Sequence, residues 1–252
     1  MSLLALDFDG VICDSAAETA ASAWRCATQV WPEDFPEPEA PAEAISAFCA
    51  VRPYLETGYQ SILMLKMLQE NLGLEAFQND LEHHLARLMQ ETALGPAELK
   101  RLFGDCRDQW IQQDLPGWLH THRFYPGVIA ALQQALLSRK EMVILTTKQE
   151  RFVLELLTGQ GVEFPAAQVW GLERQLKKEL VLLQFLNQGA QEIIFVEDRL
   201  QTLELVASRP ALDRVRLCYA PWGYGTPDDL TRVRQSTRIR LLTLPEFISL
   251  LN

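Results

Sequence analysis

Residues 3–15 read Leu3-Leu4-Ala5-Leu6-Asp7-Phe8-Asp9-Gly10-Val11-Ile12-Cys13-Asp14-Ser15. Four apolar residues lead directly into two aspartates that are separated by one residue. The apolar run predicts a short buried strand, and Gly10 predicts the turn that ends it. Two carboxylates at the end of a buried strand are costly unless they bind a cation or take part in chemistry. Because side chains two residues apart on a strand face the same way, Asp7 and Asp9 are expected to share one metal ion and one substrate.

A simpler interpretation is that Asp7 and Asp9 only form the turn, where aspartate is common. Their setting is more specific, because the hydrophobic-DFDG-hydrophobic pattern lies close to the start of the chain. This segment closely resembles the first motif of the haloacid dehalogenase superfamily. The resemblance implies that Asp7 is a nucleophile and that Asp9 is a general acid and base.

The bulk properties set limits on the function. The chain has 252 residues, enough for one large domain or for a core with a smaller insert. Its net charge of −10 argues against nucleic acid or an anionic membrane surface as a partner. The five cysteines are scattered without metal-binding spacing, which favours reduced thiols and a cytoplasmic location. We find no signal peptide and no apolar run long enough to span a membrane.

The pattern of apolar residues divides the chain into two parts. Residues 16–123 predict helices and loops, including an exposed loop at 32–43 with four prolines and five acids. From Tyr125 onward strands and helices alternate, with strands expected at residues 142–146, 169–172, 192–196, 214–219 and 239–242. This alternation predicts an α/β fold with a mostly parallel sheet and helices on both faces. The core domain is therefore expected at 1–15 and 124–252, with 16–123 as a helical insert after the first strand.

Ligands of such sheets bind at the carboxyl ends of the strands. The second strand ends in Thr146-Thr147-Lys148. Hydroxyls and backbone N–H groups there can bind phosphate oxygens, although threonine at a strand end is also a common cap. A later strand ends in Phe195-Val196-Glu197-Asp198 and repeats the acidic ending of the first strand. Carboxylates from two strands predict an oxygen-ligand site suited to Mg²⁺.

A pair of lysines follows the third strand, in Leu176-Lys177-Lys178-Glu179. A lysine at the start of a helix is normally a solvated charge and is slightly unfavourable next to the helix dipole. One lysine of this pair is therefore expected to be held for another reason. Aspartate, threonine, lysine and aspartate at successive strand ends would suit phosphoryl transfer, in which catalysis is largely positioning and charge stabilisation.

The order of these strand ends matches the four haloacid dehalogenase motifs, over about residues 3–15 and 124–252. The resemblance implies a Rossmann-like core with an all-helical C1 cap. It also implies that Thr146 and Thr147 bind the substrate phosphate and that Thr146 is catalytic. For the third motif we choose Lys177 over Lys178 as the catalytic, substrate-binding lysine, because K-x-E followed by apolar residues is a frequent form of that motif.

The same resemblance implies a metal site. Its ligands would be Asp7, the backbone carbonyl of Asp9, and Asp198. Glu197 stands where many members have glycine or aspartate. The late Trp222-Gly223-Tyr224 is similar to a W-G-Y in phosphoglycolate-phosphatase-like members. Together with the V-E-D-R-L that begins at Val196, it is also similar to uncharacterised plant and cyanobacterial proteins of this superfamily.

We therefore expect a Mg²⁺-dependent phosphatase that hydrolyses a small phosphorylated metabolite through an aspartyl-phosphate. A phosphomutase or another phosphotransferase is an alternative, because it uses the same residues. A binding or regulatory module with little turnover is a third, which Glu197 keeps open. The stretch Arg52–Tyr59 is expected to select the substrate through Arg52, unless it is only a turn between helices. A monomer and a homodimer both fit the sequence.

Overall fold

The computed structural model describes residues 2–252, so Met1, the first residue of the expected core segment 1–15, lies outside the described residues. The chain forms two compact units. One contains the described residues up to Asp14 together with Arg123–Asn252, and the other contains Ser15–His122. Each unit has a hydrophobic core of its own. None of the described helices is both long and apolar enough to cross a membrane.

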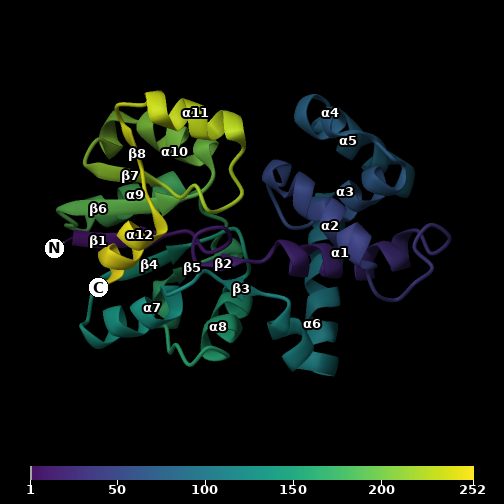
Figure 1. Cartoon of the computed structure of the whole chain (residues 1–252), viewed down its shortest axis with the longest axis horizontal. Coiled ribbons are helices and arrows are strands. Elements are labelled where there is room, and N and C mark those ends of the chain that lie inside the picture. Colours follow the sequence, from purple (N-terminus) through teal and green to yellow (C-terminus); the bar gives the residue numbers. More distant parts are fainter. Residues whose placement is uncertain (1) are drawn as a thin grey trace. The chain divides into compact units, whose positions relative to one another are not determined.

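The first unit is built on a six-stranded parallel sheet with the order β5-β4-β1-β6-β7-β8 (Figure 1). Its strands are β1 (Ser2–Leu6), β4 (Met142–Leu145), β5 (Val169–Trp170), β6 (Glu192–Glu197), β7 (Val215–Tyr219) and β8 (Ile239–Leu241). The short apolar runs seen in the sequence suit these strands, because a parallel sheet is covered on both faces. The α/β class expected from the sequence is thus confirmed.

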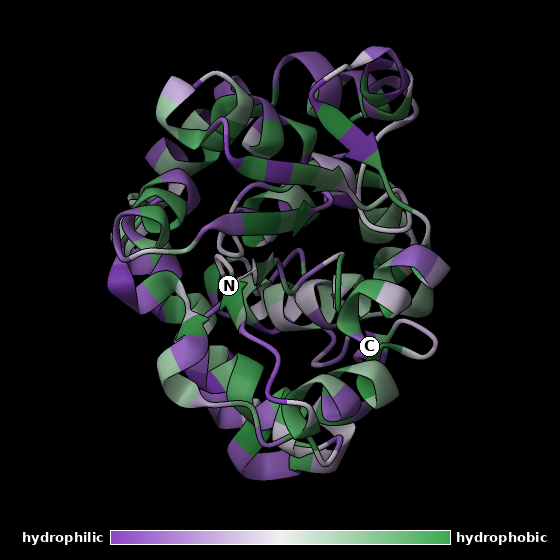
Figure 2. Cartoon of the chain, turned by 90° about the vertical axis from the view of Figure 1, so that its left-hand side faces the viewer, coloured by the Kyte–Doolittle hydropathy of each residue, from purple (hydrophilic) through white to green (hydrophobic). Residues whose placement is uncertain are grey.

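Six helices lie among the described residues of this unit. They are α7 (Val128–Leu137), α8 (Glu150–Thr158), α9 (Lys178–Asn187), α10 (Leu200–Ala207), α11 (Pro227–Gln235) and α12 (Leu244–Leu251), with short 3-10 turns at η2 (Ala166–Gln168), η3 (Leu172–Arg174) and η4 (Pro210–Leu212). Ala5 of β1 shares one buried cluster with Val181 of α9 and Leu203 of α10. The neighbouring β1 side chains, Leu4 and Leu6, are also buried. Helix ribbons in Figure 2 carry both hydrophobic and hydrophilic bands, as amphipathic helices do.

The direction in which strands are added reverses at β1. From β1 the chain goes on to β4 and β5 on one side, and then to β6, β7 and β8 on the other. The ladders also run past the ends of two strands. The N–H of Asp7 donates to Val196 O at 2.9 Å, and the N–H of Thr146 donates to Trp170 O at 3.0 Å. These bonds fix Asp7 and Thr146 at the point where such sheets bind ligands.

A two-stranded antiparallel ladder stands where the chain leaves this unit and returns to it. It joins β2 (Cys13–Asp14) to β3 (Arg123–Phe124), with Cys13 opposite Phe124 and Asp14 opposite Arg123. The rings of Phe8 and Phe124 also meet edge to face. The sequence did not predict this ladder, because two residues are too few to show an alternating pattern. The ladder holds the point where the chain leaves this unit next to the point where it returns.

The second unit contains helices and no strand among its described residues. Its elements are α1 (Ala16–Val30), α2 (Ala42–Val51), η1 (Arg52–Tyr54), α3 (Gln60–Gln69), α4 (Leu74–Asn79), α5 (Leu81–Thr92) and α6 (Pro96–His120). α1 contacts α2, α3 and α6 and so lies at the centre of the unit. The acidic, proline-rich stretch at 32–43 is irregular up to the start of α2. The helical character predicted for this region agrees with the structure.

The buried carboxylate of Glu18 joins α1 to both halves of a kinked α6. α6 has a non-helical residue at Asp114, two positions before Pro116. Arg107, before the kink, donates to the Glu18 carboxylate at 2.7 and 2.6 Å. Trp118, after the kink, donates to the same carboxylate at 3.2 Å. Because Glu18 is fully buried, these donors replace the water that its charge has lost.

Replacing Glu18 with alanine is expected to destabilise the protein by roughly 3–5 kcal/mol, because the buried guanidinium of Arg107 loses this carboxylate. Urea unfolding followed by tryptophan fluorescence measures the change. The matched control is Glu91→Ala, which removes an exposed partner of Arg87 and should cost less than about 1 kcal/mol. Similar small losses in the two variants would contradict the importance of the buried pair.

Candidate active site

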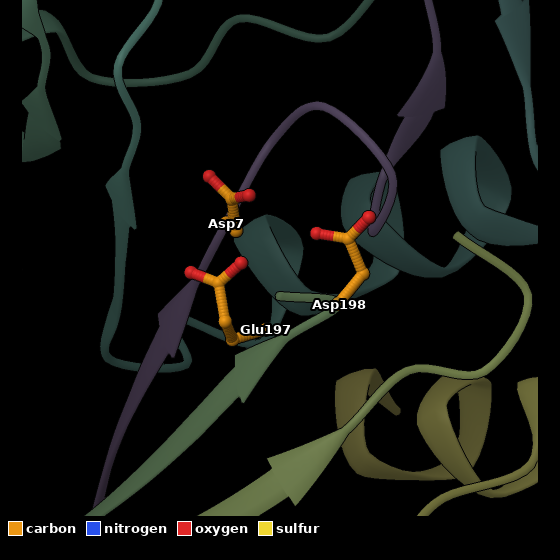
Figure 3. A group of neighbouring side chains, drawn as sticks. All are labelled: Asp7, Glu197 and Asp198. Carbon is orange, nitrogen blue, oxygen red and sulfur yellow. The ribbon is translucent and has the colours of Figure 1, made fainter. Parts of the chain in front are cut away.

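Three carboxylates gather at the carboxyl ends of the two central strands β1 and β6 (Figure 3). Asp7 follows β1, Glu197 is the last residue of β6, and Asp198 comes next. One oxygen of each carboxylate lies within 4.8 Å of the others, and all three residues are buried. Hard oxygen ligands at this separation could hold one divalent cation such as Mg²⁺.

Lys178 contacts two of these three carboxylates. Its Nζ lies 2.7 Å from Asp7 Oδ1 and 2.7 Å from Glu197 Oε2. Lys177, which we chose from the sequence, is exposed and is the residue that precedes α9. The structure therefore corrects this choice to Lys178. The reason is helical geometry, since the first residue of α9 points its side chain at the strand ends while the residue before it remains in solvent.

The crowding of charge perturbs the acids and the lysine. Burial, followed by the nearby carboxylate of Glu197, raises the pKa of Asp7 from 3.8 to about 7, although Lys178 acts in the opposite direction. Burial likewise raises the pKa of Glu197. Burial lowers the pKa of Lys178, but the charges of Asp7 and Glu197 outweigh it and hold this pKa above its ordinary value. Negative charge thus exceeds what one lysine balances, and a cation fits the donor set.

Glu197 and Asp198 differ in their partners. Glu197 uses one oxygen for Lys178 and accepts the N–H of Arg199 on the other, at 3.0 Å. Asp198 accepts the N–H of Tyr224 at 2.7 Å. These bonds give Glu197 the role of pairing with Lys178, whereas Asp198 remains the better candidate for a metal ligand.

Lys148 contacts both Thr146 and Asp9 at the same end of the sheet. Thr146 is buried at the end of β4, and its hydroxyl accepts the N–H of Lys148 at 3.0 Å, while Thr147 is exposed. The Nζ of Lys148 donates to Asp9 Oδ1 at 3.0 Å. The structure therefore brings Asp7, Asp9 and Thr146 to one edge, as expected. The sequence analysis did not select Lys148, although it follows directly after the two threonines.

A loop after β7 packs on the first motif. The indole of Trp222 donates to Val11 O at 3.2 Å, and the hydroxyl of Tyr224 donates to Asp14 at 2.9 Å. A side chain at Gly223 would collide with Gly10 O and with Asp198. Gly10 itself has φ +90° and would also meet Asp198 if it carried a Cβ. The W-G-Y resemblance was visible in the sequence, but its contacts with the acidic cluster were not.

Arg52 belongs to the helical unit, where it begins the short 3-10 turn η1. The loop that follows is ordered by Gln60, whose side-chain oxygen accepts the N–H groups of Glu56 and Thr57 at 3.0 and 2.9 Å. The hydroxyl of Tyr54 accepts a hydrogen bond from the side-chain amide of Gln78. Arg52 is thus part of a structured turn, and its role in substrate selection stays a prediction.

Comparison with known proteins shows that this chain shares its fold with several solved structures. No family model matches the chain, and no curated protein matches it. A solved structure described as a predicted phosphoglycolate phosphatase from Haemophilus somnus 129PT is 18% identical, covers 99% of this chain and 96% of its own, and has a TM-score of 0.60. A predicted phosphatase from Clostridium acetobutylicum is 14% identical over 99% and 97% of the two chains, with a TM-score of 0.58.

A third solved structure is a haloacid dehalogenase-like family protein from Streptococcus pneumoniae. It is 15% identical over 100% of this chain and 99% of its own, with a TM-score of 0.56. These structures match nearly the whole length of the chain, including the helical insert. The protein therefore has the fold of haloacid dehalogenase-like hydrolases, which confirms the fold that the resemblance implied.

Asp7→Asn is expected to stabilise the metal-free protein more at pH 8 than at pH 5. The folded-state pKa of Asp7, about 7, lies above the ordinary value of 3.8, so wild-type stability is lost as the pH rises between these values. An amide does not titrate, and Glu197 is present in both proteins. Thermal melts in a chelating buffer measure the difference in Tm between variant and wild type. A difference that does not change with pH would contradict the raised pKa.

Proposed function

We propose that this protein is a Mg²⁺-dependent phosphatase that hydrolyses a small phosphomonoester through an aspartyl-phosphate at Asp7. The observation that carries the proposal is the contact of Lys178 with Asp7 beside Asp198, at the carboxyl edge of the sheet. This set combines a buried nucleophile, a cation and a further acid. The fold shared with solved structures that are named as phosphatases and hydrolases supports the same activity.

The proposed reaction uses two displacements at phosphorus. In the first, an oxygen of Asp7 forms a bond to phosphorus while the bond to the leaving oxygen breaks, and Asp9 gives its proton to that oxygen. In the second, Asp9 takes a proton from water, which attacks phosphorus and releases Asp7 and phosphate. Lys178 and the hydroxyl of Thr146 would stabilise negative charge on the phosphoryl oxygens.

Mg²⁺ would be held by Asp7, by Asp198 and by the backbone carbonyl of Asp9. When bound, it would supply positive charge opposite the phosphate and would keep Asp7 ionised as a nucleophile. Lys178 would balance part of the same charge, and it also pairs with Glu197 beside it. The pairing of Glu197 with Lys178 gives this acid a role in the site that does not require it to bind the metal.

Asp7→Asn is expected to abolish phosphate release from p-nitrophenyl phosphate, because an amide is not a competent nucleophile. Brief incubation with labelled substrate and acid quenching should trap covalent phosphate on the wild type and not on the variant. The control is Asp213→Asn, which changes an exposed aspartate between η4 and β7 and should behave as wild type. Near-normal turnover by Asp7→Asn would exclude the aspartyl-phosphate.

Chelation should remove wild-type activity and Mg²⁺ should restore it, and full activity after exhaustive chelation would exclude the metal.

The proposed partner is a small phosphorylated metabolite met in the cytoplasm, by a protein that is a monomer or a homodimer. A panel of phosphorylated metabolites, scored for release of inorganic phosphate, identifies the substrate. Formation of an isomeric phosphate ester without phosphate release would instead indicate a phosphomutase. The negative charge of the chain gives no support for nucleic acid or an anionic membrane as a further partner.

Arg52 is proposed to contact the part of the substrate that is not phosphate. Arg52→Ala should then lower kcat/KM at least tenfold on the best substrate of the panel and change it less than about threefold on p-nitrophenyl phosphate, which offers little else to recognise. The exposed Arg101 of α6 provides the control, as Arg101→Ala should leave both values unchanged. Equal losses on the two substrates would argue against a role in recognition.

A further inference from the structure

Lys148 carries an ammonium group to which the mechanism above assigns no role. Its side chain is 3% exposed and its Nζ lies 3.0 Å from Asp9 Oδ1. A buried lysine is costly unless it is paired, and this one is paired with the carboxylate to which the proposed reaction assigns both proton transfers. The side chain of Asp9 is 16% exposed, so part of its surface remains accessible from solvent.

The backbone of Lys148 is held on both sides. Its N–H donates to the hydroxyl of Thr146 at 3.0 Å, and its carbonyl accepts the N–H of Leu172 at 3.0 Å. Gly171, the residue after β5, packs against the same carbonyl. A Cβ at this position would lie 2.7 Å from the carbonyl oxygen, so only glycine fits there. The point from which the side chain starts is therefore fixed relative to the end of β4.

We propose that Lys148 is a positioning residue for the proposed hydrolysis, holding the Asp9 carboxylate in the orientation that proton transfer requires. The inference rests on the proposed function, because it assigns Lys148 a task in that reaction. The argument is geometric. A carboxylate that follows a strand can rotate about its side-chain bonds, and a donor fixed at 3.0 Å selects one orientation. General acid and base catalysis depends on such placement.

The two steps of the reaction need Asp9 to different extents. With p-nitrophenyl phosphate the leaving phenolate needs little protonation, so the transfer of phosphate to Asp7 depends weakly on Asp9. Phenyl phosphate has a more basic leaving group and needs the proton more. Hydrolysis of the aspartyl-phosphate needs Asp9 to accept a proton from water, whatever the substrate was. Loss of a positioning residue should therefore slow hydrolysis and make phosphoryl transfer more sensitive to the leaving group.

The experiment compares Lys148→Met and Lys148→Gln with wild type in rapid-quench measurements on both substrates, with Mg²⁺ present. We expect phosphoenzyme hydrolysis to fall at least tenfold, with phosphorylation by p-nitrophenyl phosphate changed less than threefold. The ratio of phosphorylation rates between the two substrates should widen at least threefold. Lys177→Met, at the exposed neighbour of Lys178, is the matched control and should match wild type. Thermal melts show whether each variant is folded, and the second variant serves if the first is not.

Several results would overturn the inference. Unchanged hydrolysis in folded variants would do so. Equal losses in phosphorylation and hydrolysis, with the leaving-group ratio unchanged, would indicate a phosphate-binding or structural role instead. These results differ from failure of the proposed function itself, because in that case wild type would form no covalent phosphate and Asp7→Asn would remain active.

Discussion

The contact of Lys178 with Asp7 and Glu197 is the interaction on which the arrangement of the site depends. A carboxylate that has left water requires a partner of opposite charge, and here two of them share one ammonium group. The lysine is the first residue of α9, whereas Asp7 follows β1 and Glu197 ends β6. The start of this helix must therefore lie over the ends of the central strands. The third acid, Asp198, directly follows Glu197 and also lies within reach of Asp7.

The rest of the core unit serves to hold these few atoms. The turn after β1 needs Gly10 at positive φ, and the loop after β7 needs Gly223, because a side chain at either position would occupy the space of Asp198. Tyr224 then binds Asp198 with its N–H and Asp14 with its hydroxyl. One loop thus connects the acidic cluster to the β2–β3 ladder. The raised pKa of Asp7 indicates that this packing is unfavourable for the ionised acid in the absence of a cation.

The sequence was sufficient to predict the sheet and most of the acidic cluster, since apolar runs that end in aspartates are local signals. The sequence does not fix the start of a helix to within one residue. Lys177 was therefore chosen as the site lysine, although Lys178 is the first residue of α9. α11 was also missed. Its apolar pattern is weak, yet Thr226 with Pro227 and Asp229 forms a capping box that could have revealed it. The partners of Lys148 and Tyr224 lie far away in the sequence and leave no local trace.

The helical unit between β1 and β4 also has a consequence for the order of events during synthesis. β1 is made first, but its partners β4 and β6 come only after all of residues 15–122, as the pairing of Leu4 with Met142 and with Ile194 shows. Contacts of such long range form slowly, because a long loop must close before they contribute free energy. The buried residues that form the core of the insert, from Ala20 to Cys106, are all synthesised before β4. The strand that precedes Asp7 therefore has no sheet partner while more than half of the chain is synthesised, from residue 7 to the start of β4 at Met142, which exposes this hydrophobic segment to chaperones and to aggregation.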